Sequence, residues 1–97
     1  MSKGYWINTF RSVNDEAKLA RYIELSGSAI RAAGGRFLSR GNARYAFELG
    51  TIQRTTLIEF DSVEAAVAAY RSAAYQEALA VLGDGAERDI RIVEAID

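Results

Sequence analysis

Glu59 is the first candidate for chemistry, because its carboxylate lies among apolar residues in a run that predicts a β-strand. An ionised carboxylate is costly to bury without a partner. Arg36 and Arg40 are expected to share one face of the preceding strand and to reach Glu59 across the sheet. In one interpretation Glu59 and Arg40 are catalytic: Glu59 abstracts a proton next to a carbonyl, and Arg40 stabilises the enolate or a substrate carboxylate. In the other they form a structural salt bridge.

Aromatic and amide side chains form the second group of candidates. We expect them to converge on an uncovered sheet surface, although rings with polar tips are typical of pockets, cores and dimer interfaces alike. Asn8 needs hydrogen-bond partners from protein or ligand, because its strand is otherwise apolar. Tyr70 and Tyr75 are five positions apart, so we expect only one of them to face the pocket. The predicted substrate-binding residues are Trp6, Asn8, Phe37, Tyr45, Tyr70 and Tyr75.

The composition excludes several classes of protein. A length of 97 residues allows one domain, residues 1–97. The absence of cysteine and histidine removes disulfides, thiolate nucleophiles, zinc clusters, Ser-His-Asp triads and proximal-histidine haem ligation, so we predict no metal and no cofactor. A net charge of −1 and a pI of 5.5 argue against a nonspecific nucleic-acid binder. Without an apolar run of about 18 residues or a signal-peptide core, we expect a cytoplasmic protein without membrane contact.

Alternating apolar and polar residues predict four β-strands, over residues 4–13, 36–49, 54–60 and 89–96. The second of these runs is interrupted near Gly41 and Asn42. We interpret the interruption as a bulge rather than a hairpin, with the chain reversal at residues 50–53.

Two helical regions separate these strands. The first is expected to begin after a cap at Asn14 and to end at Gly34 and Gly35. The second begins at Ser62, and Ser72 restarts it as a short further helix.

The order βαββαβ predicts a ferredoxin-like α+β fold, with a four-stranded antiparallel sheet and the helices on one face. The other face then carries large apolar side chains without a helix to cover them. Because an exposed apolar patch of that size usually indicates a partner, we predict a homodimer through the sheet face, a dimeric α+β barrel with an internal cavity at the interface.

Four segments resemble one known family, the domain of unknown function 1330. They are Gly4-Tyr5-Trp6-Ile7, Gly34-Gly35-Arg36-Phe37-Leu38-Ser39-Arg40-Gly41, Ile58-Glu59-Phe60-Asp61-Ser62 and Tyr70-Arg71-Ser72-Ala73-Ala74-Tyr75-Gln76. The resemblance spans nearly the whole chain and implies a dimeric α+β barrel without an established activity. Barrels of the same architecture include cofactor-independent monooxygenases and muconolactone-type isomerases, an analogy at the level of fold. The sequence departs from the family at Ala73, where proline is frequent, and at Glu48-Leu49-Gly50, where a Glu-Gly pair is usual.

Three functions stay open. The first is an enzyme or binding protein that takes a small organic acid or aromatic molecule in the cavity at the dimer interface. The second is a non-enzymatic interaction protein whose uncovered face serves only dimerisation. The third is an RNA-recognition module, which shares the βαββαβ order. The third strand argues against it, because it offers only Phe60 and an acid where single-stranded RNA readers have a basic and aromatic pattern. The sequence leaves open whether the chain is an enzyme.

Overall fold

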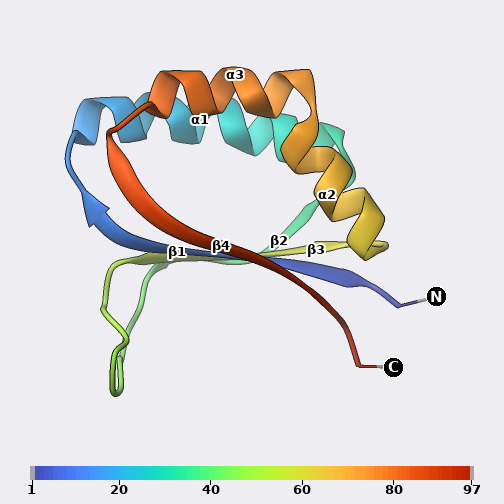
Figure 1. Cartoon of the computed structure of the whole chain (residues 1–97), viewed down its shortest axis with the longest axis horizontal. Helices are drawn as coiled ribbons and strands as arrows, with labels where there is room; N and C mark the ends of the chain where they lie inside the picture. The colour runs from blue at the N-terminus through green and yellow to red at the C-terminus, as the bar shows by residue number, and fades with distance from the viewer. Residues whose placement is uncertain (1, 97) are drawn as a thin grey trace.

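The computed structural model describes residues 2–96. Its elements are β1 (Gly4–Val13), α1 (Glu16–Ala32), β2 (Arg36–Asn42), β3 (Arg54–Phe60), α2 (Val63–Arg71), α3 (Ala73–Leu82) and β4 (Ala86–Glu94). The strands form one four-stranded antiparallel sheet in the order β2-β3-β1-β4, with the three helices on one face (Figure 1). The predicted ferredoxin-like α+β fold is therefore confirmed.

The core lies between the sheet and its helices. Burial alternates along β1 and β3, so that every second side chain of each strand points toward the helices and the others point away. Trp6, Ile58, Phe60 and Tyr75 are the largest of the core side chains that are completely buried. Trp6 lies at the centre of an aromatic cluster, with its ring centroid 5.0 Å from that of Tyr75 and 5.7 Å from that of Tyr70. Packing of one face of the sheet against the helices thus fixes which residues of each strand can line an internal site.

Hydroxyl and carboxyl side chains cap the three helices. Ser62 caps α2 and Ser72 caps α3, as predicted from the sequence. Asp15, not the predicted Asn14, caps α1 by accepting a hydrogen bond from the amide of Lys18 at 3.0 Å. The prediction of Asn14 was wrong because its side-chain amide instead donates to a backbone carbonyl in the turn between α3 and β4.

The bulge of β2 lies nearer its start than predicted. Phe37 pairs with Ile58 and Ser39 pairs with Leu57, so Leu38 is the extra residue, and Gly41 and Asn42 are regular members of the strand. An extra residue moves all following side chains to the opposite face of a sheet, because side chains alternate with period two. The bulge therefore sets the direction of every later side chain in β2.

β2 is also shorter than predicted, since it ends at Asn42 rather than at residue 49. Residues 43–53, here called the arm, project from the sheet on the side away from the helices (Figure 1). The chain reverses at residues 47–50 rather than at 50–53: Glu48 has φ 55°, and the Gly50 amide donates to the Phe47 carbonyl at 2.9 Å. β4 likewise begins and ends earlier than predicted.

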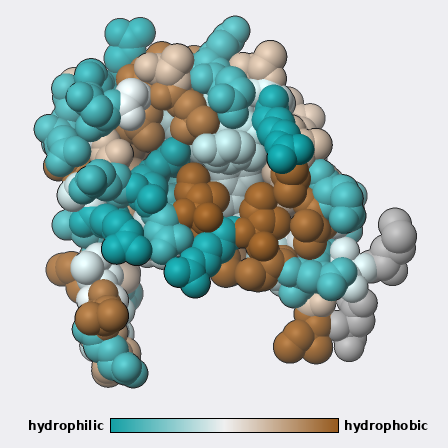
Figure 2. All heavy atoms as spheres, viewed as in Figure 1, coloured by the Kyte–Doolittle hydropathy of each residue, from teal (hydrophilic) through white to brown (hydrophobic). Residues whose placement is uncertain are grey.

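The face of the sheet opposite the helices, here called the bare face, is uncovered over the part of the chain that the structure describes. Its side chains on β1 and β3, including Tyr5, Ile7 and Leu57, are half-buried. The arm beside it carries hydrophobic side chains into solvent (Figure 2). Those that are mostly exposed are Tyr45, Phe47, Leu49 and Ile52. None of the helices within residues 2–96 has the length and apolar character needed to span a membrane.

Candidate functional site

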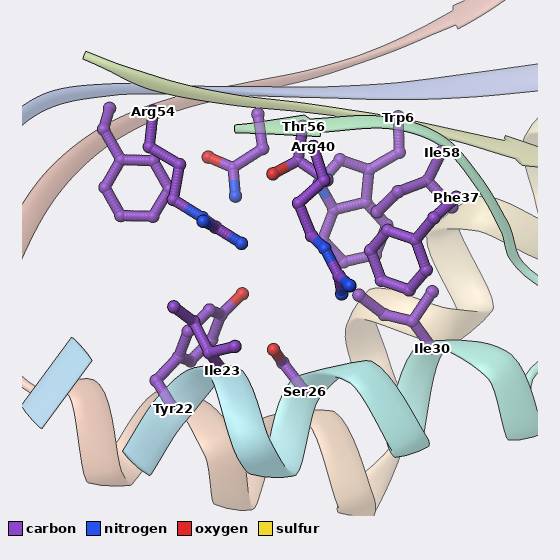
Figure 3. A pocket seen from close by; sticks show the side chains of 12 residues that line it. Trp6, Tyr22, Ile23, Ser26, Ile30, Phe37, Arg40, Arg54, Thr56 and Ile58 are labelled. Atoms are coloured by element: carbon purple, nitrogen blue, oxygen red, sulfur yellow. The ribbon is translucent and has the colours of Figure 1, made fainter. Parts of the chain in front are cut away.

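The candidate site is a pocket between α1 and the helix-facing side of the sheet (Figure 3). It is formed by residues of one chain, on the opposite side of the sheet from the surface where the sequence analysis expected it. The lining residues are Trp6, Asn8 and Phe10 of β1, Tyr22, Ile23, Ser26 and Ile30 of α1, Phe37 and Arg40 of β2, and Arg54, Thr56 and Ile58 of β3.

Thr56 lies at the centre of the polar part of this pocket. In the strand register its partner on β1 is Asn8, and its partner on β2 is Arg40. Directly paired residues point to the same face and lie about 5 Å apart. Arg54 lies two positions before Thr56 on the same strand and therefore on the same face. The fold thus brings an amide, a hydroxyl and two guanidinium groups from three strands onto one patch of the sheet.

Arg40 and Arg54 extend from the sheet into the space above α1, and Tyr22 and Ser26 point toward them from the helix (Figure 3). Neither arginine has an ion-pair partner within residues 2–96. Burial lowers the pKa of Arg54, and the positive charge of Arg40 lowers it further. A guanidinium keeps its proton in proteins, so the two groups place uncompensated positive charge at the pocket.

Two other polar atoms of the pocket residues are buried without a hydrogen-bond partner. They are Nε1 of Trp6 and Oδ1 of Asn8, whose residues are 0% and 5% exposed. Buried polar groups are nearly always hydrogen-bonded, and an unmade bond costs about 1–3 kcal/mol. The pocket therefore holds one unused donor and one unused acceptor beside its arginines.

A cluster of two phenols and a guanidinium supports the pocket from behind. The hydroxyls of Tyr22 and Tyr75 lie 2.6 Å apart, and Arg88 Nη1 donates to the Tyr22 hydroxyl at 2.9 Å. Burial raises the pKa of Tyr75, and the neighbouring phenol of Tyr22 adds to the rise. The guanidinium of Arg88 also lies over the Tyr22 ring, 4.9 Å from its centroid. These contacts hold Tyr22, a pocket residue, in a fixed orientation.

The space inside the pocket has a volume of about 20 Å³, enough for about one water molecule. Arg40 forms an exposed wall of the pocket, and its guanidinium lies 4.9 Å from the centroid of the Phe37 ring. A long, solvent-exposed side chain can change rotamer readily, so movement of Arg40 would enlarge the pocket.

Glu59 lies on the bare face, away from the pocket. Its carboxylate accepts hydrogen bonds from Arg36 Nε at 3.0 Å, Lys3 Nζ at 3.3 Å and the Tyr5 hydroxyl at 3.4 Å. The hydrogen bond from Arg36 lowers the pKa of Glu59, and Lys3 contributes to the same effect. Arg36 thus pairs with Glu59 as predicted. The expected contact with Arg40 is not formed, because the bulge at Leu38 turns Arg40 to the other face.

The structure brings together four of the predicted site residues: Trp6, Asn8, Phe37 and Arg40 line one pocket. Tyr75 is fully buried beside Trp6 and Tyr22, behind the pocket. Tyr70 packs against Trp6 and lines a separate shallow groove at the β4 edge with two isoleucines. Tyr45 lies on the arm and is 77% exposed.

Arg54, Thr56, Tyr22 and Ser26 line the pocket, but the sequence analysis did not single them out. The sequence does contain a pattern that places two of them. Arg54 and Thr56 alternate along β3 in step with the core residues Ile58 and Phe60, so they are polar residues on the face that is buried. Tyr22 and Ser26 are four positions apart and so share a helix face. Within residues 2–96 no cluster of three acidic side chains suits a metal ion.

Comparison with known proteins identifies the family. The family described as Domain of unknown function (DUF1330) matches residues 3–96, so the chain belongs to it, as its sequence predicted. No curated protein matches the sequence.

Solved structures share the fold at low sequence identity. A protein of unknown function from Rhodopseudomonas palustris, RPA0582, is 17% identical with a TM-score of 0.75, over 99% of this chain and 84% of that one. A putative antibiotic biosynthesis monooxygenase from Caulobacter crescentus is 16% identical with a TM-score of 0.66, over 99% and 92% of the two chains. A dimeric ferredoxin-like protein from Thermobifida fusca is 16% identical with a TM-score of 0.59, over 97% and 92%. At these identities the likeness shows the fold alone.

Proposed function

We propose that this protein binds a small organic acid in the pocket between α1 and the sheet, with Arg40 and Arg54 holding the acid group. The observation that carries the proposal is the pair of pocket arginines without a carboxylate partner within residues 2–96. Arginine binds carboxylates through parallel, charge-assisted hydrogen bonds, and an anion between two guanidiniums relieves their mutual repulsion.

The apolar lining supports the same ligand class. Ile30, Phe37 and Ile58 surround the polar patch, so a hydrocarbon or aromatic part of the ligand has apolar contacts beside its acid group. The fold is also that of a putative antibiotic biosynthesis monooxygenase from Caulobacter crescentus and of a cofactor-independent oxygenase from Streptomyces nogalater. Our proposal is limited to binding, because Glu59 and Arg40 lie on opposite faces of the sheet and do not share a site within one chain.

The proposal predicts that Arg54→Met weakens acid binding. We expect propionate and benzoate to bind the wild-type protein and benzyl alcohol, which lacks the acid group, to bind much less. The loss of charge-assisted hydrogen bonds to one arginine weakens binding roughly 10- to 100-fold. Fluorescence of Trp6, the only tryptophan, measures the affinity from inside the pocket. Arg21→Met, at an exposed position of α1, is the matched control. Equal affinities of wild type and Arg54→Met would contradict the proposal, as would the failure of both acids to bind.

We further infer that two copies associate through the bare face, with the arm of each against the other. The exposed apolar side chains of the arm support this, and so does the fold shared with a protein named as dimeric. If the dimer forms and no acid binds, the alternative of a non-enzymatic interaction protein takes the place of the first proposal. A cytoplasmic location stays a prediction from the sequence.

A further inference from the structure

The unpartnered atoms of Trp6 and Asn8 indicate which hydrogen-bonding groups the ligand carries in addition to its acid group. The two residues are neighbours on the same face of β1, and both line the pocket that holds Arg40 and Arg54. Oδ1 of Asn8 is an acceptor that needs a donor, and Nε1 of Trp6 is a donor that needs an acceptor. A simple carboxylate has acceptor oxygens only, so it satisfies Trp6 and the arginines but leaves Asn8 unpaired.

We infer that the preferred ligand is a hydroxy acid whose hydroxyl group lies on the carbon next to the carboxyl group. This inference rests on the proposed function. The carboxylate lies between Arg40 and Arg54, the hydroxyl donates to Oδ1 of Asn8, and a ligand oxygen accepts from Nε1 of Trp6. Each orphaned atom then has a partner of the required kind.

The strand register supports a short distance between the acid and the hydroxyl. Asn8 and Arg40 flank Thr56 on neighbouring strands, so their backbones are separated by two strand spacings, about 10 Å. The guanidinium of Arg40 lies 4.9 Å from the centroid of the Phe37 ring, and a rotamer change of this long, exposed side chain would bring it over Thr56. An acid group bound to its guanidinium above Thr56 therefore lies close to Asn8, and a hydroxyl on the adjacent carbon is within reach. The small volume of the pocket, about 20 Å³, also favours a compact ligand.

Lactate and propionate test the inference, because they differ only in the hydroxyl group. We expect the wild-type protein to bind lactate about tenfold more tightly than propionate, since propionate leaves the buried acceptor unpaired. Asn8→Leu removes the acceptor, so it should bind the two acids with equal affinity. Its thermal midpoint should match or exceed that of the wild type, because an unsatisfied buried group has been replaced by an apolar one. Asn8→Ala serves in its place if the larger side chain prevents folding.

The indole N–H resonance of Trp6 gives a second readout, because the chain has one tryptophan and hence one such signal. We expect this resonance to move downfield when lactate is added, as Nε1 gains an acceptor, and to stay in place with the neutral analogue 2-propanol. Equal affinities of wild type for lactate and propionate, both lost in Arg54→Met, would overturn the inference and leave the proposed function standing. A lactate preference that persists in Asn8→Leu would overturn it as well. Failure of both acids to bind would overturn the proposed function itself.

Discussion

At the scale of single residues, the two faces of the sheet differ in how their charges are paired. On the bare face, Glu59 is held by Lys3 and Arg36, and Asp89 is held by Arg11 and Arg91. On the helix-facing side, the pocket arginines have no carboxylate within residues 2–96. The ion pairs of Glu59 are complete within the chain, as a structural role requires, whereas the unpaired pocket arginines are the basis of the proposed acid site. The structural interpretation of Glu59 therefore accounts for its contacts.

Glu59→Gln should change the acid stability of the protein. Because Arg36 lowers the pKa of Glu59 from its ordinary value of 4.5, the folded state releases this proton more readily than the unfolded state. The carboxylate therefore contributes stability at neutral pH, and this contribution is lost as the pH falls below 4.5 and through the folded-state pKa. Glu59→Gln should be less stable than wild type at pH 7 and should lose less on acidification. Thermal unfolding at pH 7 and pH 3 measures both effects.

Glu77→Gln is the matched control, because Glu77 is exposed on α3 and has no ion pair within residues 2–96. Both variants remove one acidic charge, but only Glu59→Gln removes ion pairs. Affinity for propionate should be unchanged in Glu59→Gln, since the side chain lies on the other face of the sheet. If Glu59→Gln keeps its structure but binds propionate much more weakly than wild type, Glu59 takes part in binding.

At the scale of helices and strands, most features that depend on residues close in sequence were predicted correctly, whereas features that depend on strand pairing were not. β1 has the predicted bounds, and Ser62 and Ser72 cap the predicted helices, because alternation and capping depend on residues close in sequence. The bulge at Leu38 depends on how β2 pairs with β3, which no residue of β2 specifies alone. Because the bulge was predicted near Gly41 instead, Arg40 was assigned to the wrong face of the sheet. The predicted pair of Arg40 with Glu59 is therefore not formed.

The candidate site was predictable only where the sequence shows which side chains of a strand point toward the helices. Trp6 and Asn8 were singled out as an aromatic ring and an amide in an apolar strand, and both line the pocket. The choice of face was wrong because β1 is apolar on both sides, so its pattern does not say which side meets the helices. Tyr22 and Ser26 could not be assigned to a pocket, because a polar group on a helix stripe indicates a site only once the opposing strand residues are known.

Ser72→Ala tests the junction that places Tyr75 in the core. The Ser72 hydroxyl donates to the Ala69 carbonyl at 2.8 Å and accepts from the Tyr75 amide at 3.2 Å, so it ends α2 and begins α3. Loss of a serine cap costs about 1 kcal/mol, and a second hydrogen bond is lost with it. We expect a lower midpoint in urea unfolding with an unchanged slope. Ser28→Ala, at an exposed position inside α1, should have little effect. Equal midpoints for Ser72→Ala and wild type would show that the junction does not depend on the cap.

At the scale of the whole molecule, the distribution of apolar surface suggests an assembly larger than one chain. The helices cover one face of the sheet, while the arm extends past the other and exposes large side chains (Figures 1 and 2). Between the arm and the bare face lies an open groove of about 550 Å³. A second copy packed on the bare face by two-fold symmetry would contribute its own arm on the opposite side, so that both arms lose their contact with water.

The double variant Phe47→Ser/Leu49→Ser should therefore dissociate the dimer. Phe47 and Leu49 are 80% and 100% exposed in one chain, and burying each against a partner is worth roughly 1.5–3 kcal/mol, so their joint loss weakens a dimer by two orders of magnitude or more. Sedimentation at micromolar concentration should give a dimer for wild type and a folded monomer for the variant.

The control is Leu25→Ser, because Leu25 is a partly exposed apolar residue of α1, on the helical side of the molecule. This variant should remain dimeric. A monomeric wild type would contradict the proposed dimer. A double variant that remains dimeric would show that the arm does not contribute to the dimer interface. Because the pocket of Arg40 and Arg54 lies on the helix-facing side, the proposed function predicts that the monomeric variant binds propionate with wild-type affinity.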